Sequence, residues 1–314
     1  MKKMLAVVGP TASGKSGLAV ELCKKYGGEV VSCDSMQIYK KMNIGTAKPT
    51  EEEMQGVPHH LVDFLEPGTD YSVSDYVADA ERCVKDLESR NVLPVFCGGT
   101  GLYIDSFLSG MKFSEFENNP DVRKKLELEF VSDGIDGIYN RLSKADPEMA
   151  DAVDIHNTKR VIRALEVYET TGITMSEWNR RSKENADKKD CLTIGLDYED
   201  RQILYDRIDM RVDLMLESGL LEETKKLIDD GLLTTKTASQ AIAYKELMPY
   251  FDGTDSLENC VEILKRSSRR YAKRQLTWFR RNKNIKWIFK DGLEYGEILD
   301  AAFEIVDKYL SEEN

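Results

Sequence analysis

Residues 4–26 read MLAVVGPTASGKSGLAVELCKKY. Met4–Val8 is a short apolar run, as expected of a strand buried inside a sheet, and a glycine-rich turn follows it directly. Leu18, Leu22 and Tyr26 then recur four residues apart, which predicts one face of a helix. A strand, a tight turn and a helix in this order begin a parallel sheet flanked by helices, so this segment predicts an α/β protein.

The turn matches the phosphate-binding pattern G-x-x-x-x-G-K-[ST], in the strand-to-helix context that the pattern requires. Its residues are Gly9, Pro10, Thr11, Ala12, Ser13, Gly14, Lys15 and Ser16. In such a loop the backbone N–H groups face an anion, the lysine neutralises charge and the serine can hold Mg²⁺. We therefore predict a P-loop NTPase-like fold, with ATP, GTP or another diphosphate compound left open as the ligand.

Two further apolar runs, Glu29–Cys33 and Val92–Cys97, predict parallel strands, with a helix between them that begins after Ser74. Asp34 follows the first run, and a Gly-Gly-Thr-Gly turn that contains Thr100 follows the second. Because parallel strands end at the same edge of a sheet, we expect both residues to share one cleft with the phosphate loop. The residues alone leave Asp34 as either a magnesium ligand or a base.

The pattern of the chain changes beyond residue 111. Residues 112–190 are charged and helical in pattern, with Asn119 and the following proline as a helix start, and Cys191–Leu196 returns to a strand pattern. We therefore predict a catalytic core formed by residues 1–111 and 191–314. A helical insertion domain at residues 112–190 interrupts this core.

The last hundred residues predict a long helix with a basic surface. Mostly apolar side chains at three- and four-residue steps form its buried stripe: Leu257, Val261, Leu264, Ser268, Tyr271, Gln275 and Phe279. The protein has a net charge of −12, yet Lys265–Lys290 contains eleven Lys or Arg and no Asp or Glu. A basic surface on an acidic protein predicts contact with a polyanion. An alternating run, Ile285–Phe289, predicts a closing strand.

The cysteines bear on the cellular compartment. All six are scattered without a C-x-x-C pair, which favours free thiols over a zinc site or disulfides and indicates a reducing cytoplasm. The opening apolar run is far shorter than the roughly 18 residues that a membrane-spanning helix needs. We therefore expect a cytoplasmic protein that has no membrane segment. We also expect the protein to work as a monomer.

The segment Asp34–Pro49, DSMQIYKKMNIGTAKP, together with the phosphate loop, resembles tRNA dimethylallyltransferases of the bacterial type, also called tRNA isopentenyltransferases. The resemblance extends through Pro58–Leu61, Gly98–Tyr103, Arg163–Tyr168, Arg207–Leu216, Gln240–Lys245 and Lys273–Arg280. Within one of these blocks, Ala243 stands where the family usually has glycine. The joint match covers nearly the whole chain and is far more specific than the phosphate loop alone.

The resemblance implies transfer of a dimethylallyl group from dimethylallyl diphosphate to the exocyclic amine of the adenosine that is 3′-adjacent to the anticodon in tRNA. The product would be isopentenyladenosine, and diphosphate would be released. Lys15 and Ser16, together with Mg²⁺, would stabilise the departing diphosphate. Arg207 would add a further clamp, with Arg201 and Arg211 as alternatives.

The resemblance also implies how the tRNA is held. Asp34 would accept a hydrogen bond from the adenosine amine and take its proton as the carbon–nitrogen bond forms. The anticodon loop would be held by phosphate contacts and stacking. The implied tRNA-binding residues are Asp34, Ser35, Met36, Gln37, Thr100, Arg123, Lys159, Arg160, Arg163, Gln240, Lys245, Lys273, Arg274, Gln275, Trp278 and Arg280. For Arg123 and Lys159, ordinary exposed helix charge is an equal alternative.

Three other functions share some of these features. An adenylate dimethylallyltransferase or a small-molecule P-loop kinase would have the same phosphate loop and acidic residue, but neither needs a basic aromatic helix or a large helical insertion. A nucleotide-regulated RNA-binding protein would keep the loop and the basic surface, but it has no reason to place Asp34 in the cleft. These features favour transfer to tRNA.

Overall fold

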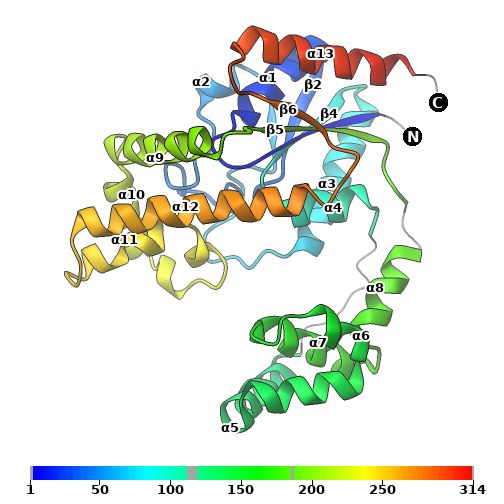
Figure 1. The fold of residues 1–314 in the computed structure, drawn as a ribbon, viewed down its shortest axis with the longest axis vertical. Helices are drawn as coiled ribbons and strands as arrows, with labels where there is room; N and C mark the ends of the chain where they lie inside the picture. Colours follow the sequence, from blue (N-terminus) through cyan, green and yellow to red (C-terminus); the bar gives the residue numbers. More distant parts are fainter. Residues whose placement is uncertain (1–2, 112–118, 185–186, 313–314) are drawn as a thin grey trace. The chain divides into compact units, whose positions relative to one another are not determined.

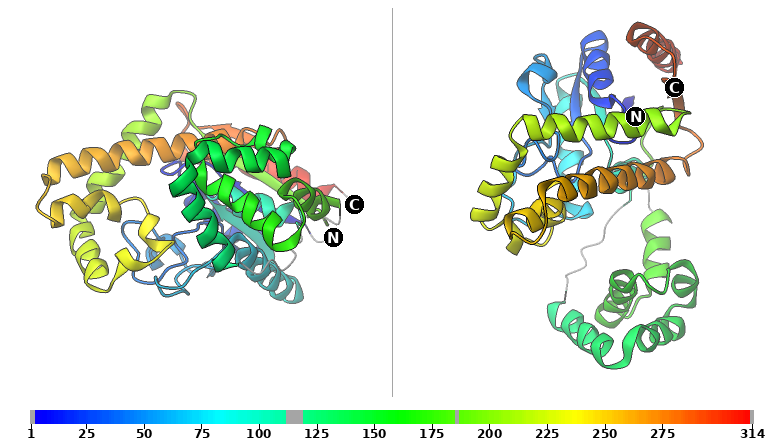
Figure 2. Two further views of the ribbon diagram at one scale, coloured as in Figure 1. Left: turned by 90° about the horizontal axis from the view of Figure 1, so that it is seen from below. Right: turned by 60° about the vertical axis from the view of Figure 1, so that its left-hand side comes forward.

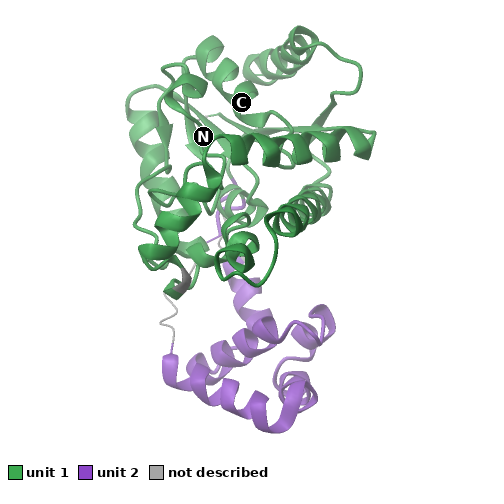
Figure 3. Cartoon of the chain, turned by 90° about the vertical axis from the view of Figure 1, so that its left-hand side faces the viewer, with its two compact units in different colours: residues 1–108, 189–314 green, residues 109–188 purple. Residues whose placement is uncertain are grey.

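The computed structural model describes residues 3–111, 119–184 and 187–312. The chain forms two compact units, and the second interrupts the first (Figure 3). The larger unit comprises residues 1–108 and 189–314, and the smaller unit comprises residues 109–188. The predicted boundaries, after residues 111 and 190, lie a few residues beyond those in the structure.

The larger unit contains a six-stranded sheet whose neighbouring strands all pair in parallel (Figure 1). The strands are β1 (Met4–Val8), β2 (Gly28–Ser32), β3 (His59–His60), β4 (Leu93–Gly98), β5 (Cys191–Asp197) and β6 (Lys286–Phe289). They lie in the order β3-β2-β4-β1-β5-β6. The parallel α/β sheet and its five predicted strands are confirmed, while the two-residue edge strand β3 was not predicted.

Strand β1 lies inside the sheet, and all five of its residues are buried. It pairs with β4 on one side, where Val8 lies opposite Gly98, and with β5 on the other, where Val8 lies opposite Gly195. Asp34 follows β2, which pairs with β4. The phosphate loop, Asp34 and the Gly98 turn therefore lie at the same edge of the sheet, as expected.

Helices cover both faces of this sheet (Figures 1 and 2). On one face, α1 (Lys15–Tyr26) and α13 (Tyr295–Ser311) share an apolar core with the strands. On the other face, α3 (Val73–Ser89) and α4 (Gly101–Leu108) form a second core. The short helix α2 (Glu51–Met54) precedes β3. The sheet is therefore covered on both sides, as in other parallel α/β proteins.

The start of α3 differs from the expectation. The helix is capped by Ser72, whose hydroxyl accepts from the Asp75 backbone N–H at 3.3 Å. The Asp75 carboxylate in turn accepts from the Ser72 backbone N–H at 2.8 Å. This reciprocal capping box satisfies two N–H groups at once, so the prediction of Ser74 as the cap was wrong by two residues.

The larger unit contains further helices after β5. They are α9 (Arg201–Glu217), α10 (Leu220–Asp229), the 3₁₀ turns η1 (Leu232–Thr234) and η2 (Ala238–Gln240), α11 (Tyr244–Phe251) and α12 (Leu257–Phe279). Helix α12 confirms the predicted long helix, and its stripe residues Leu264, Gln275 and Phe279 are buried. Ala243 has a φ of 97°, a region that favours glycine, which explains why a glycine is usual at this position.

The smaller unit is a bundle of helices with its own apolar core. Its helices are α5 (Pro120–Ala145), α6 (Pro147–Ala152), α7 (Thr158–Thr171) and α8 (Met175–Glu184). Asn119 caps α5 by accepting from two backbone N–H groups, as its position before a proline predicted. Gly134, with a φ of 71°, kinks α5, and Leu126, Leu142 and Leu165 are fully buried between the helices.

All six cysteines are free thiols. None of the helices in the described ranges is long and apolar enough to cross a membrane. The same ranges contain no cluster of three or more His, Cys, Asp or Glu side chains that could hold a metal ion.

Candidate functional site

The phosphate loop curls through three residues with positive φ: Gly9 at 148°, Ala12 at 62° and Gly14 at 86°. A Cβ atom on Gly9 would lie 2.5 Å from the carbonyl oxygen of Leu196, so only glycine fits there. Gly14 is the N-cap of α1, whose first-turn N–H groups have no acceptor within the helix. These N–H groups make the loop suitable for an anion.

Lys15 and Arg211 are two of the cations that contact this loop. The Lys15 ammonium donates to the Pro10 carbonyl at 3.2 Å, and the Arg211 guanidinium, from α9, donates to the Thr11 hydroxyl at 3.0 Å. Burial is the main cause that lowers the pKa of Lys15 and the pKa of Arg211. The charge of Arg211 lowers the pKa of Lys15 further. The charge of Asp34 acts in the opposite direction on both cations. Two neighbouring cations that lose hydration are unfavourable without a counter-ion, so the site favours an anionic ligand.

Asp34 is held in place by a short turn of its own chain. Its Oδ1 accepts from the backbone N–H groups of Met36 at 2.9 Å and Gln37 at 3.3 Å. Within the described part of the chain, no group donates a hydrogen bond to Oδ2. The carboxylate is therefore oriented through one oxygen and available to a ligand through the other, which suits a base.

Thr100 connects this turn to the second glycine-rich turn. Its Oγ1 accepts from the Ser35 backbone N–H at 3.0 Å and donates to the Ser35 hydroxyl at 3.3 Å. A Cβ on Gly98 would lie 2.4 Å from the Cys33 carbonyl oxygen, so the close approach of the two segments requires glycine. The structure thus brings together three predicted site residues: Asp34, Ser35 and Thr100.

Gln275, on α12, joins the two glycine-rich turns to each other. Its Oε1 accepts from the Thr11 backbone N–H at 2.8 Å, and its Nε2 donates to the Gly99 carbonyl at 3.0 Å. The side chain is 5% exposed. Gln275 was predicted to bind tRNA, whereas in the structure its amide is buried and hydrogen-bonded within the protein.

The three arginines considered as diphosphate clamps lie in different surroundings. Arg207 is exposed, and its Nε donates to the carbonyl of Ala12 at 3.1 Å. Arg201 binds the buried carboxylate of Asp197 through two hydrogen bonds of 2.6 and 2.8 Å. Arg211 is therefore the one of the three that acts on the other charges of the site.

A family model described as IPP transferase matches residues 37–282. The chain belongs to this family. It is 45% identical to a tRNA dimethylallyltransferase of Caldanaerobacter subterraneus subsp. tengcongensis, over 96% of each chain. It is 41% identical to the solved tRNA isopentenylpyrophosphate transferase of Bacillus halodurans. That comparison has a TM-score of 0.74 and covers 99% of this chain and 97% of that chain. A eukaryotic dimethylallyltransferase acting on tRNA is 30% identical, with a TM-score of 0.86, over all of this chain and 81% of that chain.

In this IPP transferase family member, α12 divides its basic residues between two faces. Lys265 pairs with Asp213 of α9 at 2.7 Å. Arg269 pairs with Asp209 of the same helix at 2.5 Å. The exposed basic residues of α12 are Arg266, Arg270, Lys273 and Arg274. The basic segment seen in the sequence thus serves both to join two helices and to form a basic surface.

Two more of the predicted tRNA-binding residues, Trp278 and Arg280, lie at the C-terminal end of α12. Arg280 is exposed and donates to Asp197 at 3.0 Å. The indole N–H of Trp278 donates to Asp105 at 2.6 Å, and a Cβ on Gly101 would lie 2.2 Å from its ring. A hollow of about 340 Å³ is lined by Arg280, Asn282, Lys283, Ile285, Trp287 and Phe289.

Other predicted contacts lie in loops of the larger unit. The Gln37 amide donates to the carbonyls of Thr46 and Ala47 at 3.1 and 2.9 Å, so it shapes the loop that follows. Gln240 and Lys245 are exposed, at η2 and in the first turn of α11. Ser35 and Met36 are partly exposed.

Two of the predicted tRNA-binding arginines meet inside the smaller unit. Arg123 of α5 and Arg163 of α7 both donate to the carboxylate of Glu166, at 3.3 and 3.1 Å. Glu166 is 1% exposed, so this carboxylate fixes both guanidinium groups from beneath the surface. Lys159 and Arg160 lie exposed in the first turn of α7.

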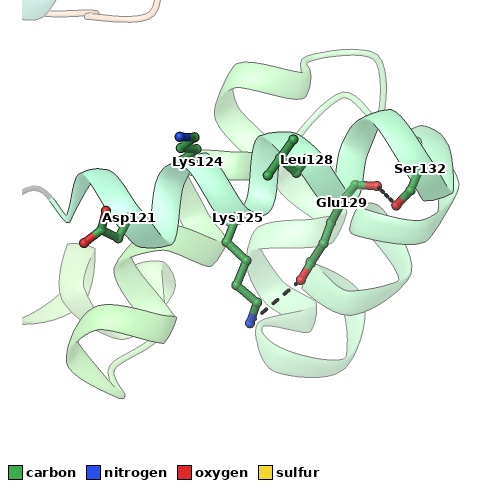
Figure 4. Close-up of a pocket in the computed structure, with 6 residues that line it drawn as sticks. All are labelled: Asp121, Lys124, Lys125, Leu128, Glu129 and Ser132. Atoms are coloured by element: carbon green, nitrogen blue, oxygen red, sulfur yellow. Dashed lines mark hydrogen bonds and ion pairs between the residues drawn. The ribbon is translucent and has the colours of Figure 1, made fainter.

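A separate hollow of about 500 Å³ lies along α5 (Figure 4). Its lining residues are Asp121, Lys124, Lys125, Leu128, Glu129 and Ser132. Lys125 and Glu129 form an ion pair of 3.8 Å within it, and no predicted site residue lines it. Its mixed charges therefore point to no particular ligand.

Sequence reasoning did not select Tyr271, although it lies one helical turn before Gln275. The Tyr271 side chain lies close to those of Thr100 and Gln275. Burial raises the pKa of its phenol, and Asp34 acts in the same direction. The position of Tyr271 in the stripe of α12 indicated burial, but nothing in the sequence indicated that this stripe faces the site.

Proposed function

We propose that this protein transfers a dimethylallyl group from dimethylallyl diphosphate to the exocyclic amine of the adenosine 3′-adjacent to the anticodon in tRNA. The observation that carries the proposal is the meeting of Lys15, Arg211 and Asp34 at one site. Cations there suit a diphosphate, and a carboxylate beside them suits an amine that must lose a proton. The family membership and the names of the relatives support the same reaction.

The phosphate loop and its cations would hold the diphosphate. As the bond between the allylic carbon and the diphosphate oxygen breaks, both bonding electrons leave with the oxygen. Lys15, Arg211 and the N–H groups of the loop would stabilise this charge in a partly buried site, where electrostatic interactions are strong. Their contribution is greatest when the leaving group carries its full charge.

The residues fit Mg²⁺ only in combination with a ligand. Ser16 is exposed in the first turn of α1 and offers one hard oxygen donor, while the described residues contain no cluster of acidic side chains for a metal. The remaining ligands would be diphosphate oxygens and waters. When bound, Mg²⁺ would supply Lewis-acid stabilisation of the leaving group. We therefore expect the protein to bind Mg²⁺ measurably only when diphosphate is present.

Asp34 would orient the adenosine amine and take its proton. The nitrogen lone pair is delocalised into the purine, so the amine is a weak nucleophile and must be placed accurately. The free Oδ2 of Asp34 is suited to accept a hydrogen bond from this amine, and the Thr100–Ser35 contact holds the turn behind it. As the carbon–nitrogen bond forms, the proton passes to the carboxylate.

The exposed face of α12 would bind the RNA backbone. Arg266, Arg270, Lys273 and Arg274 lie on the helix that also carries Gln275 and Tyr271 to the site. RNA phosphates on this face would therefore lie near the reacting groups. A tRNA substrate and six free thiols support a cytoplasmic location, and we propose a monomer as the working form.

The deciding assay supplies radiolabelled dimethylallyl diphosphate with unmodified tRNA, with AMP, or with neither. Label in tRNA alone supports the proposed reaction. Label in AMP would indicate an adenylate dimethylallyltransferase. Turnover of ATP without transfer of label would instead indicate a small-molecule kinase and overturn the proposal.

A further inference from the structure

Lys290 follows the edge strand β6 and reaches the phosphate loop. Its backbone N–H donates to the Asp197 carbonyl at 3.0 Å, which extends the pairing of β6 with β5 by one residue. Its ammonium donates to the Ser13 carbonyl at 2.8 Å. A Cβ on Gly14 would lie 3.0 Å from this nitrogen, so the ammonium lies directly against the loop.

Arg207 makes the matching contact one peptide earlier in the loop. Its Nε donates to the Ala12 carbonyl at 3.1 Å. The guanidinium and the Lys290 ammonium lie 5.9 and 5.3 Å from the centre of the same ring, that of Tyr198. Burial lowers the pKa of Lys290, and Arg207 lowers it further. Two cations are thus held together beside consecutive carbonyls of the loop, although they repel each other.

Peptide geometry links these carbonyls to the anion site. A trans peptide directs its C=O and its N–H to opposite sides, and none of the described peptide bonds is cis. The Ser13 carbonyl and the Gly14 N–H belong to one peptide group, so an ammonium that holds the carbonyl also fixes the direction of the N–H. Hydrogen bonding at the carbonyl also polarises the peptide and strengthens its N–H as a donor.

The neighbouring peptide group has a different role. The Ala12 carbonyl and the Ser13 N–H form this neighbouring peptide group. The Ser13 N–H donates to the Pro10 carbonyl at 3.3 Å. Arg207 therefore stabilises the internal turn of the loop, in which Ala12 has a positive φ. The Gly14 N–H makes no backbone hydrogen bond among the described residues, which leaves it available to a ligand.

We propose that Lys290, assisted by Arg207, is a positioning residue that holds the Gly14 N–H toward the diphosphate. The inference rests on the proposed function, because it names a further determinant of the same diphosphate site. Lys290 acts from outside the site, through the peptide group, and does not contact the diphosphate itself. Its loss should therefore weaken diphosphate binding while leaving RNA binding intact.

The test measures binding of inorganic diphosphate with Mg²⁺ by calorimetry, without RNA, to the full chain. Lys290→Met should weaken this binding about tenfold, and Lys290→Arg should stay within about threefold of the native protein because it keeps a cationic donor. Lys286→Met is the matched control, since it removes the same charge from an exposed residue of β6. It should leave the affinity unchanged.

A second readout separates positioning from general stability. The amide proton resonance of Gly14 should move downfield when diphosphate is added to the native protein, and much less in Lys290→Met. Thermal unfolding, followed by circular dichroism, checks that the variants are folded at the assay temperature. Unchanged affinity and an unchanged Gly14 shift in Lys290→Met would overturn the inference.

The outcomes for the inference and for the proposed function remain distinct. If the native protein binds diphosphate but transfers no label to tRNA, the proposed function fails and the binding comparison still tests Lys290. If the native protein transfers label and Lys290→Met binds diphosphate normally, the inference fails and the proposed function stands. An equal loss in Lys286→Met would show a general effect of charge and would also overturn the inference.

Discussion

Lys15 and Arg211 at the phosphate loop carry the same charge as Lys273 and Arg274 on α12, but the two pairs differ in their exposure to solvent. The first two make specific hydrogen bonds and are buried enough that their pKa values fall. The second two are exposed. A desolvated cation is unfavourable until a ligand neutralises it, whereas an exposed cation keeps its hydration.

This difference separates two kinds of recognition within one protein. Desolvated cations in fixed positions suit a small anion of defined geometry, and salt screens them weakly. Exposed cations along a helix suit a polyanion whose phosphates release counterions on binding, with strong dependence on salt. Substitutions in the two regions should therefore change different measurements.

The largest effect is expected at Asp34, which lies beside the partly buried cations Lys15 and Arg211. Asp34→Asn keeps the size of the side chain but removes its ability to take the amine proton. Single-turnover transfer should fall by about 10² to 10⁴-fold, with both substrates still bound. Near-normal rates with altered Mg²⁺ dependence would reassign Asp34 to metal binding, and near-normal rates with ordinary Mg²⁺ dependence would make it structural.

The next effect compares two arginines one turn apart on α9. Arg211→Met should lower kcat/KM for dimethylallyl diphosphate by about 10² to 10³-fold, because it removes a cation from the site itself. Arg207→Met removes a hydrogen bond to the Ala12 carbonyl and should lower kcat/KM by less than about tenfold. Steady-state kinetics at saturating tRNA distinguish the two, and a larger loss in Arg207→Met would reverse their assignment.

The lowered pKa of Lys15 predicts a pH effect that an exposed lysine should not show. The protonated form binds the anion, so affinity for inorganic diphosphate should fall as the pH rises through the lowered pKa, which lies below the ordinary 10.5. Above that pKa the fall approaches about tenfold per pH unit. Calorimetry across alkaline pH measures it, and Lys15→Met should remove the dependence. Affinity that falls only above pH 10.5 in the native protein would contradict this.

On the exposed face of α12, salt dependence is the expected signature. Replacing both Lys273 and Arg274 with Ala should reduce the slope of log affinity for tRNA against log salt by about one for each lost phosphate contact. Filter binding between low and moderate salt measures this slope. Diphosphate affinity in the same variant should not change, and an unaltered slope would mean that these side chains are merely solvated.

The smallest effect compares neighbouring residues with different partners. Arg270→Ala should reduce the salt slope by about one, because Arg270 is exposed. Arg269→Ala should leave the slope almost unchanged, because Arg269 already pairs with Asp209, and should lower stability by at most about 1 kcal/mol. Equal slopes in the two variants would show that the ion pair opens to bind RNA.

The sequence predicted the elements whose signals are local. The turn between β1 and α1 follows from eight consecutive residues, and the strands beside it are short apolar runs, so this turn and these strands were predicted correctly. The start of α3 could also have been found, because Ser72 and Asp75 have capping-box spacing. Strand β3 has only two residues, and its pairing with β2 depends on residues distant in the sequence.

The residues that were hardest to predict depend on how a helix is rotated. Arg207 and Arg211 lie one turn apart in the same block, and only the packing of α9 decides which one acts on Lys15 and Asp34. Gln275 lies in a basic segment, yet packing turns its amide toward Thr11 and away from solvent. The sequence predicts that these residues lie on helices, but the tertiary contacts set their roles.

The connection between the two units has a consequence for how the chain can be cut and rejoined. Where the smaller unit begins and ends, the Lys189 backbone N–H donates to the Leu108 carbonyl at 3.0 Å. The chain thus leaves the catalytic core and returns to it at almost the same point, so a linker of a few residues could bridge that gap. The strands β1, β4 and β5 pair with one another through residues outside 109–188. Residues 109–188 therefore form a module that could be removed or exchanged as one piece.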